Sequence, residues 1–172
     1  ASIEPYMLQA ITFKTDPARL TAVKMLGELK SKKAIDPLIV TLNDEYENIA
    51  VAAAVSLGRI GDPKAISALS KTAQSGSVRL RGASTTSIRT IGGEAAVQAL
   101  AAAMGDISIK VRNQAVAGLI EAGDAAEAAA LKALKSKNNY ERESAIRILK
   151  GINKVPTAGN HAVWFQLSSF SL

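Results

Sequence analysis

The stretch SLGRIGDPKAISALSKTA at residues 56–73 is a variant of the stretch MLGELKSKKAIDPLIVTL at residues 25–42. Each contains an apolar stripe at helical spacing, a short break and a second apolar stripe. In residues 56–73, Gly61 stands where a helix should end, and the following Asp62 and Pro63 are residues that typically begin a helix. The pattern predicts two helices joined by a tight turn.

This pattern recurs along the chain at a period of 31 residues, which shortens to 30 for the last copy. We call the first helix of each copy the A helix. Its central apolar column holds Leu26, Leu57, Ile88, Leu119 and Leu149. Four residues earlier lies a column of small residues, Ala22, Ala53, Ser84, Ala115 and Ala145. Three residues later lies a third column, Leu29, Ile60, Ile91, Ala122 and Ile152. These spacings place the three columns on one face, which we expect to be buried.

The second helix of each copy, the B helix, shows two further columns at the 31-residue period. The first column contains Ile35, Ile66, Val97 and Ala128. The second column contains Leu38, Leu69, Leu100 and Leu131. A pair of helices this short buries too little apolar surface to offset the entropy of ordering it, so successive copies must stack and share one core.

Composition supports an all-helical chain. Of the 172 residues 48% are apolar and only 4% are aromatic, which favours tightly packed helices over a β-sandwich. We expect a repeat array over residues 1–152 and a C-terminal cap or linker over residues 153–172. The array should consist of a half repeat at 2–13 and repeats near 17–43, 47–74, 78–105, 109–136 and 139–152. An array that opens on a half repeat suggests a domain excised from a longer protein, or a terminal cap.

The stretch AVSLGRIGDPKAISAL at residues 54–69 resembles the short bacterial and archaeal HEAT repeats of the phycobilin-lyase type. The resemblance covers about residues 2–152. It implies a right-handed α-solenoid of about five HEAT-like helical hairpins, an α-α superhelix whose B helices line the concave side. Members of that family serve as protein-binding scaffolds, regulatory subunits, lyase components and occasionally nucleic-acid enzymes, so the resemblance indicates a fold more sharply than a function.

The resemblance also implies an arginine early in each A helix that pairs with an aspartate of the preceding loop. The arginine column contains Arg19, Arg81, Arg112 and Arg142, with Ala50 in the second copy. The acidic column is filled only by Asp44 and Asp106. We therefore expect Asp106 and Arg112 to be a structural pair that ties successive repeats together through charge-assisted hydrogen bonds.

Candidate catalytic and metal-binding residues are scarce. The chain has no cysteine, which excludes disulfides, thiolate metal sites and cysteine nucleophiles. The one histidine, His161, lies in the C-terminal segment, far along the chain from every repeat loop. The glycines of the breaks match no phosphate-binding motif. We therefore predict no catalytic, cofactor or metal site, no cofactor, and a chain that is not an enzyme.

Two features of the later repeats point to a binding surface. Between Pro63 and Gly93 there are five basic residues and no acidic one, and a second basic run begins at Lys132. The B helices of residues 94–106 and 124–134 hold more alanine than one buried stripe uses. These alanines are either good helix formers on an exposed face or the lining of a shallow groove for a partner helix. The predicted partner-binding residues are Lys64, Lys71, Arg79, Arg89, Ala95, Ala99, Ala102, Lys132 and Lys135.

These observations predict a non-catalytic protein-interaction scaffold or adaptor that binds a helix or an acidic surface of another protein on its concave B-helix face. The net charge of +6 leaves nucleic-acid binding as an alternative, although only Tyr140 is interleaved with the basic residues. A subunit of a lyase-type enzyme is the second alternative. No apolar run reaches the roughly 18 to 20 residues that span a bilayer. The oligomeric state and the compartment, cytoplasmic or exported, stay open.

Overall fold

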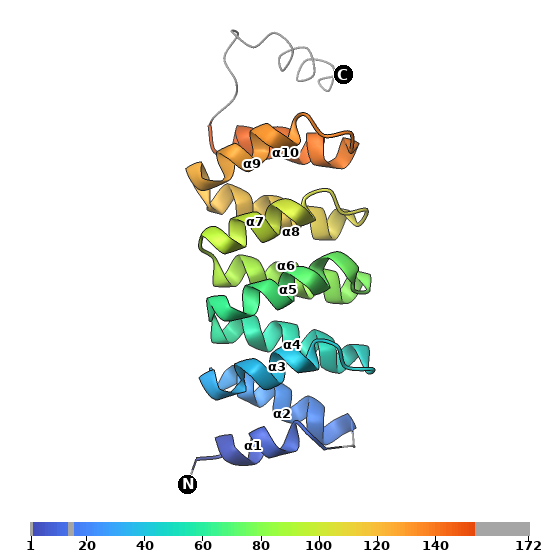
Figure 1. Cartoon of the computed structure of the whole chain (residues 1–172), viewed down its shortest axis with the longest axis vertical. Coiled ribbons are helices and arrows are strands. Elements are labelled where there is room, and N and C mark those ends of the chain that lie inside the picture. Colours follow the sequence, from blue (N-terminus) through green and yellow to red (C-terminus); the bar gives the residue numbers. More distant parts are fainter. Residues whose placement is uncertain (1, 14–15, 154–172) are drawn as a thin grey trace.

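The computed structural model describes residues 2–13 and 16–153, and all the regular structure in these ranges is helical (Figure 1). The described residues form ten α-helices: α1 (Glu4–Ala10), α2 (Asp16–Glu28), α3 (Ile35–Thr41), α4 (Glu47–Ile60), α5 (Ile66–Ser75), α6 (Val78–Ile91), α7 (Glu94–Ala103), α8 (Ile109–Glu121), α9 (Glu127–Ala133) and α10 (Asn139–Gly151). Three short 3₁₀ helices precede B helices: η1 (Lys32–Ala34), η2 (Pro63–Ala65) and η3 (Gly123–Ala126).

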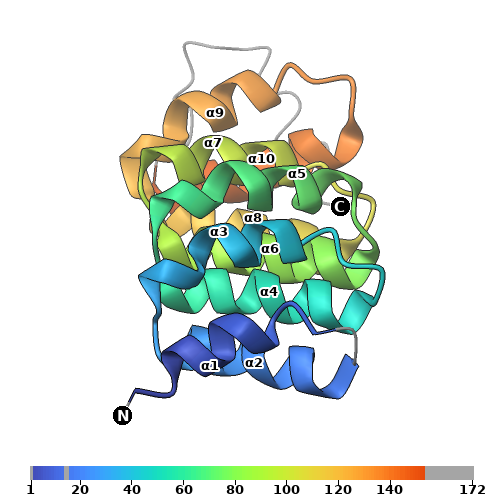
Figure 2. The ribbon, with the colours of Figure 1, turned by 60° about the horizontal axis from the view of Figure 1, so that its bottom comes forward.

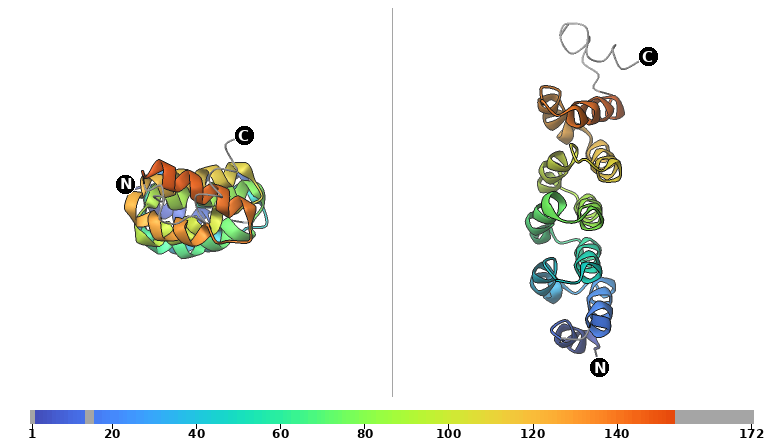
Figure 3. Two further views of the ribbon diagram at one scale, coloured as in Figure 1. Left: turned by 90° about the horizontal axis from the view of Figure 1, so that it is seen from above. Right: turned by 90° about the vertical axis from the view of Figure 1, so that its right-hand side faces the viewer.

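The helices stack in two layers. The even-numbered helices are the A helices and form one layer, and the odd-numbered helices are the B helices and form the other (Figure 3). Figure 2 shows the B helices in the order α1, α3, α5, α7 and α9 along the stack. The chain is therefore an α-solenoid, which confirms the predicted all-α fold class. The predicted cap or linker at 153–172, with His161, falls outside the described residues except for Asn153.

Each A helix is followed within two residues by a residue with positive φ, and in three repeats this residue is the glycine of the predicted break. Gly61, Gly92 and Gly123 have φ values of 76°, 71° and 61°, a region that favours glycine because it lacks Cβ. In the first repeat Lys30 takes this place with φ 49°. The Asp62 side chain then accepts a hydrogen bond from the backbone N–H of Lys64 at 2.9 Å and so caps the next helix.

The first two predicted columns of the A helices form the centre of the core. All ten residues of the central and small-residue columns, from Ala22 to Leu149, are buried. The third column is buried less well, and the prediction is wrong at Leu29, which is 48% exposed. Its physical reason is local: α2 ends at Glu28, so Leu29 already lies beyond the helix, whereas Ile60 and Ile91 still belong to α4 and α6.

The predicted columns of the B helices are correct in three copies and wrong in the fourth. Ile35, Ile66 and Val97 are buried with their partners Leu38, Leu69 and Leu100, but Ala128 is exposed and Leu131 is 41% exposed. In that copy the core positions are Ala126, Ala130, Ala133 and Leu134. The connection from Leu119 to Ala126 is one residue shorter than that from Ile88 to Ala96, so the whole of α9 is shifted by one residue.

Packing between repeats is carried mainly by the A layer. Helices α2, α4 and α6 pack extensively on one another, and each B helix packs most extensively on the A helix that follows it. Glycines let the A helices approach closely: a Cβ atom added at Gly58 would lie 2.6 Å from the Oγ of Ser87 on α6. The buried hydroxyl of Ser56 donates to the carbonyl oxygen of Val23 at 2.8 Å and joins α4 to α2.

Candidate partner-binding face

Two of the predicted binding arginines lie in the A layer and are already paired. Both belong to α6. Arg79 contacts Glu47 of α4, with 3.0 Å between Nη1 and Oε2. Arg89 donates two hydrogen bonds to Glu121 of α8, one of them 2.7 Å from Nε to Oε2. These bonds raise the pKa of Arg89 and lower the pKa of Glu121. Both arginines therefore serve contacts between repeats, and their positive charges are partly neutralised.

The arginine column also ties repeats together, but in a different register from the one expected. The carboxylate of Asp106 accepts hydrogen bonds from Nε and Nη2 of Arg81, at 2.7 and 2.9 Å. Arg19 forms an ion pair with Asp44 at the same sequence separation. Each arginine thus reaches the aspartate 25 residues later. The carboxylate partner of Asp106 is Arg81 rather than Arg112, which corrects the predicted pair.

Arg112 contacts the backbone next to Asp106 instead. Its Nη1 donates to the carbonyl oxygens of Asp106 and Ile107, at 2.7 and 3.0 Å, and its guanidinium lies 4.0 Å from the centre of the Tyr140 ring. The residue 25 positions after Arg112 is Lys137, so no carboxylate is available there. The Tyr140 ring and the two carbonyl oxygens therefore contact the buried Arg112 cation where a carboxylate is missing.

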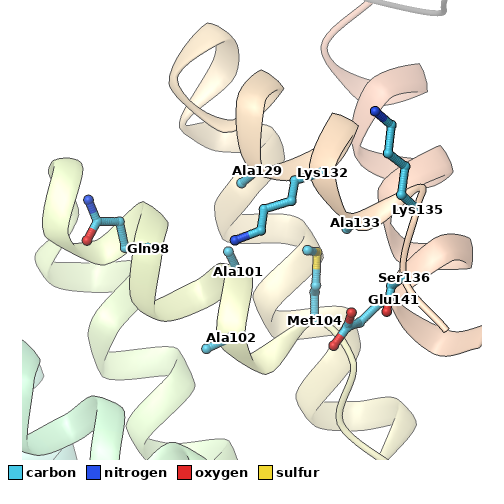
Figure 4. A pocket seen from close by; sticks show the side chains of 10 residues that line it. All are labelled: Gln98, Ala101, Ala102, Met104, Ala129, Lys132, Ala133, Lys135, Ser136 and Glu141. Atoms are coloured by element: carbon cyan, nitrogen blue, oxygen red, sulfur yellow. The ribbon is translucent and has the colours of Figure 1, made fainter. Parts of the chain in front are cut away.

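The B-helix face, which we define as the surface formed by α3, α5, α7 and α9, carries two grooves. The larger, of about 720 Å³, lies between α7 and α9 and is called the α7–α9 groove. It is lined by Gln98, Ala101, Ala102, Met104, Ala129, Lys132, Ala133, Lys135, Ser136 and Glu141 (Figure 4). Small side chains make up much of its wall, and Figure 4 shows Lys132 extending from α9 toward Ala101 of α7.

The second groove, of about 350 Å³, lies between α3 and α5 and is called the α3–α5 groove. It is lined by Ile39, Leu42, Asn43, Lys64, Ser67, Ala68, Lys71 and Thr72. Lys64 bonds to Asp36, with 2.7 Å between Nζ and Oδ1. Lys71 makes no ion pair with any described residue, and the same holds for Lys132 and Lys135. Both grooves therefore have lysine ammonium groups at their edges.

The predicted binding residues are thus divided between the two layers. Lys64, Lys71, Ala102, Lys132 and Lys135 line the grooves of the B-helix face, and Ala95 is exposed at the start of α7. Ala99 was expected to be exposed, but it is buried, with 7% of its surface accessible. The physical reason is that α7 packs on α5 as well as on α6 and α8, so it buries a wider stripe than a helix covered on one side.

Sequence reasoning missed seven of the ten residues that line the larger groove. Gln98 belongs to α7, Met104 directly follows α7, Ser136 lies in the connection between α9 and α10, and Glu141 lies near the start of α10. Their shared location depends on how far α7 and α9 stand apart, and α7 contacts α9 less than it contacts α5. Ala101 could have been found, because it stands beside the predicted Ala102 in an alanine-rich helix.

Other kinds of site receive no support from the described residues. Within residues 2–13 and 16–153, no group of three or more His, Asp or Glu side chains could hold a metal ion. No helix in the same ranges is long and apolar enough to cross a membrane. A smaller cavity of about 170 Å³ between α6, α7 and α8 is lined by the paired Arg89 and Glu121 with glycines and small apolar residues.

Solved structures share this architecture. The phycocyanin lyase complex of CpcE and CpcF from Nostoc sp. PCC7120 superposes with a TM-score of 0.65 at 18% identity, over 98% of this chain and 70% of that one. An engineered protein gives a TM-score of 0.61 at 18% identity, over 100% and 91% of the two chains. A computationally designed armadillo repeat protein for modular peptide recognition gives 0.58 at 18% identity, over 98% and 93%. At this identity the likeness shows the fold alone.

Sequence comparison gives the same assignment for the first half of the chain. No curated protein matches the sequence. The family model for HEAT repeats matches residues 5–89, which extend from α1 to near the end of α6. The remaining helices continue the same two layers without interruption (Figure 1). The expected resemblance to HEAT repeats is thereby confirmed over residues 5–89, and the described residues together form one α-solenoid.

Proposed function

We propose that this chain is a non-catalytic interaction module that binds another protein on its B-helix face. The observation that carries the proposal is the α7–α9 groove, because it combines a volume of about 720 Å³, small side chains and two lysines that make no ion pair with a described residue. Volumes of this size are typical of ligand sites, and alanine walls let a partner backbone or helix come close. In the A layer, by contrast, several charged side chains form ion pairs between repeats.

The fold supports this role in general terms. HEAT and armadillo solenoids are typically protein-interaction scaffolds, and the designed armadillo protein with a similar fold was made for peptide recognition. A solenoid exposes one helical layer along its whole length, so a partner can contact several repeats at once. The proposal places such contacts on α3, α5, α7 and α9.

The alternative of nucleic-acid binding has less support. Three of the predicted basic residues, Lys64, Arg79 and Arg89, are paired with carboxylates. Helices α3, α5, α7 and α9 contain no aromatic residue on which a base could stack. The alternative of a lyase-type subunit rests on a likeness of fold, which does not specify a reaction.

Site-specific photocrosslinking tests the proposal. A benzophenone amino acid is placed at Ala102 on the B-helix face or at Thr90 in the A layer; both residues are exposed. After irradiation in extracts of the source cells, the position 102 variant should crosslink to a defined protein, which is identified by mass spectrometry and then purified and rebound. The position 90 variant should not crosslink to it.

The opposite pattern would contradict the proposal. A protein crosslinked from position 90 alone would place the binding surface in the A layer. A crosslink from position 102 to nucleic acid rather than protein would favour the alternative function.

A further inference from the structure

Two lysines of the B-helix face that make no ion pair with a described residue, Lys71 and Lys132, occupy related places in two grooves. Lys71 follows the buried Leu69 by two residues on α5, and Lys132 follows the buried Ala130 by two residues on α9. They therefore hold the same structural position, two repeats apart. Lys71 lines the α3–α5 groove, and Lys132 lines the α7–α9 groove. Ala102 holds this position on α7, between them.

The charges that line the two grooves are predominantly positive. The α3–α5 groove is lined by Lys64 and Lys71 and by no acidic residue, although Lys64 is paired with Asp36 outside it. The α7–α9 groove is lined by Lys132 and Lys135 against one acidic residue, Glu141. A ligand with carboxylates would replace the water around the unpaired ammonium groups with charge-assisted hydrogen bonds.

The distance between the grooves can be matched by a short peptide. Neighbouring packed helices lie about 8 to 10 Å apart, and α7 and α9 pack less closely than α5 and α7, so two repeats place the equivalent lysines at least about 20 Å apart along the stack. An extended chain advances about 3.3 Å per residue, so about six residues or slightly more span this distance. The small side chains of Ala101 and Ala102 lie along the α7 side of this path and leave room for a backbone.

We infer that the B-helix face binds an extended acidic segment of another protein, which crosses α7 and places one carboxylate near Lys71 and another near Lys132 and Lys135. This inference rests on the proposed function and specifies the chemistry of the partner. The unpaired lysines supply charge complementarity, and the two grooves hold the side chains that flank the carboxylates. An acidic peptide fits this face better than a nucleic acid because aromatic residues are absent from α3, α5, α7 and α9.

Selection from a peptide library tests the inference without a known partner. A phage-displayed library of random 16-residue peptides is panned on the immobilised full chain, and enriched peptides are synthesised with a fluorophore for anisotropy measurements. We expect enrichment of Asp and Glu, with two acidic residues about six positions apart. The triple variant Lys71→Glu, Lys132→Glu and Lys135→Glu should weaken their binding by at least about tenfold.

A matched control separates the site from overall charge. The variant Lys24→Glu, Lys110→Glu and Lys150→Glu changes the net charge by the same amount, but its residues are exposed in the A layer. Its affinity for the peptides should stay within about threefold of wild type. The single change Lys71→Ala should weaken binding several-fold as well, since the inferred segment reaches both grooves.

Several outcomes would overturn the inference. They are enrichment of peptides without acidic residues, no enrichment at all, equal loss of affinity in both triple variants, or full affinity in Lys71→Ala. Tight binding of a labelled 20-nucleotide single strand through the same three lysines would assign the face to nucleic acid instead. Photocrosslinking of a protein from position 102 would still support the proposed function if only the acidic specificity failed.

Discussion

The A layer and the B layer of this solenoid alternate along one chain and yet pack differently. A helices approach so closely that glycines meet serines of the next helix, and arginines bond to carboxylates of the neighbouring repeat. Between B helices, α7 and α9 stand far enough apart to leave a groove, and three lysines have no carboxylate partner among the described residues. Equivalent helices of neighbouring repeats therefore pack more extensively in the A layer than in the B layer.

This difference assigns separate roles to the two layers. Close packing and satisfied ion pairs in the A layer stabilise the order of the repeats, so substitutions there should lower the free energy of unfolding. The B layer can vary its exposed side chains with little effect on stability, which leaves them available for recognition. Substitutions that remove A-layer contacts should therefore destabilise the chain more than substitutions of exposed B-layer side chains.

The largest effect is expected for Leu57→Ala in the A layer. Leu57 is completely buried in the centre of α4, and truncation of such a side chain leaves a cavity. The free energy of unfolding should fall by about 2 to 5 kcal/mol in urea denaturation followed by circular dichroism. Val40→Ala is the matched control, because Val40 on α3 is 73% exposed, and its loss should stay below about 0.5 kcal/mol. Equal losses would contradict the assignment of Leu57 to the core.

A smaller loss is expected for Arg81→Met, which removes the bidentate pair with Asp106. Both side chains are largely buried, and the change leaves the carboxylate of Asp106 without its main donor. The loss should be about 1.5 to 3 kcal/mol by the same denaturation assay, as for hydrogen bonds to charged groups. An unchanged midpoint of urea denaturation would mean that the pair of Arg81 on α6 with Asp106 before α8 does not stabilise the stack.

The Arg81 pair should also make stability depend on pH. Burial of Asp106 opposes its ionisation, but hydrogen bonds from Arg81 and from the backbone N–H of Ser108 outweigh this effect, so its pKa lies below the ordinary value. The folded state therefore binds this proton less tightly than the unfolded state. The contribution of ionised Asp106 to the free energy of unfolding is complete above about pH 4 and is lost as the pH falls through the folded-state pKa of Asp106. In thermal melts the difference between wild type and Arg81→Met should narrow below about pH 4.

Gly58→Ala tests the close approach of α4 and α6. Alanine normally favours a helix over glycine, but a Cβ atom at this position would lie 2.8 Å from the Cβ and 3.0 Å from the Cα of Ser87. We expect a loss of about 1 to 3 kcal/mol, as overpacked cores show. Gly82→Ala in α6 is the control, since its nearest neighbour would be the Oε1 of Gln114 at 3.4 Å, and it should be neutral or stabilising. Similar results for both glycines would argue against tight A-layer packing.

The stacking of the A helices could be predicted from sequence because each central residue recurs at one period. Leu26, Leu57, Ile88 and Leu119 are large apolar residues that recur every 31 residues, each with a small residue four positions earlier, so the pattern identifies one buried face of the helix. Helix α9 could not be placed this way. In the stretch AEAAALKAL at residues 126–134 nearly every side of the helix offers alanine or leucine, so the pattern cannot reveal that the preceding connection is one residue shorter.

The candidate site was predictable in its charges but not in its boundaries. Lys71, Lys132 and Lys135 were selected from basic runs, and the same runs include Arg79 and Arg89, which serve other contacts. Distinguishing them requires knowing that residues about 32 positions apart meet across neighbouring A helices, as Arg89 and Glu121 do. The grooves depend on the spacing between B helices, which arises from the packing of the whole stack.

The smallest effect on stability is expected for Lys132→Glu, although it reverses a charge in the proposed binding groove. Lys132 makes no ion pair with a described residue, so the free energy of unfolding should change by less than about 0.5 kcal/mol. Arg89→Glu is the comparison in the A layer, because it removes the pair with Glu121 and sets two carboxylates side by side. Because the Arg89–Glu121 pair is exposed, Arg89→Glu should lower the free energy of unfolding by only about 1 kcal/mol at low salt. Urea denaturation of both variants at low and high salt checks the difference, and salt should narrow it, because screening weakens the repulsion in Arg89→Glu.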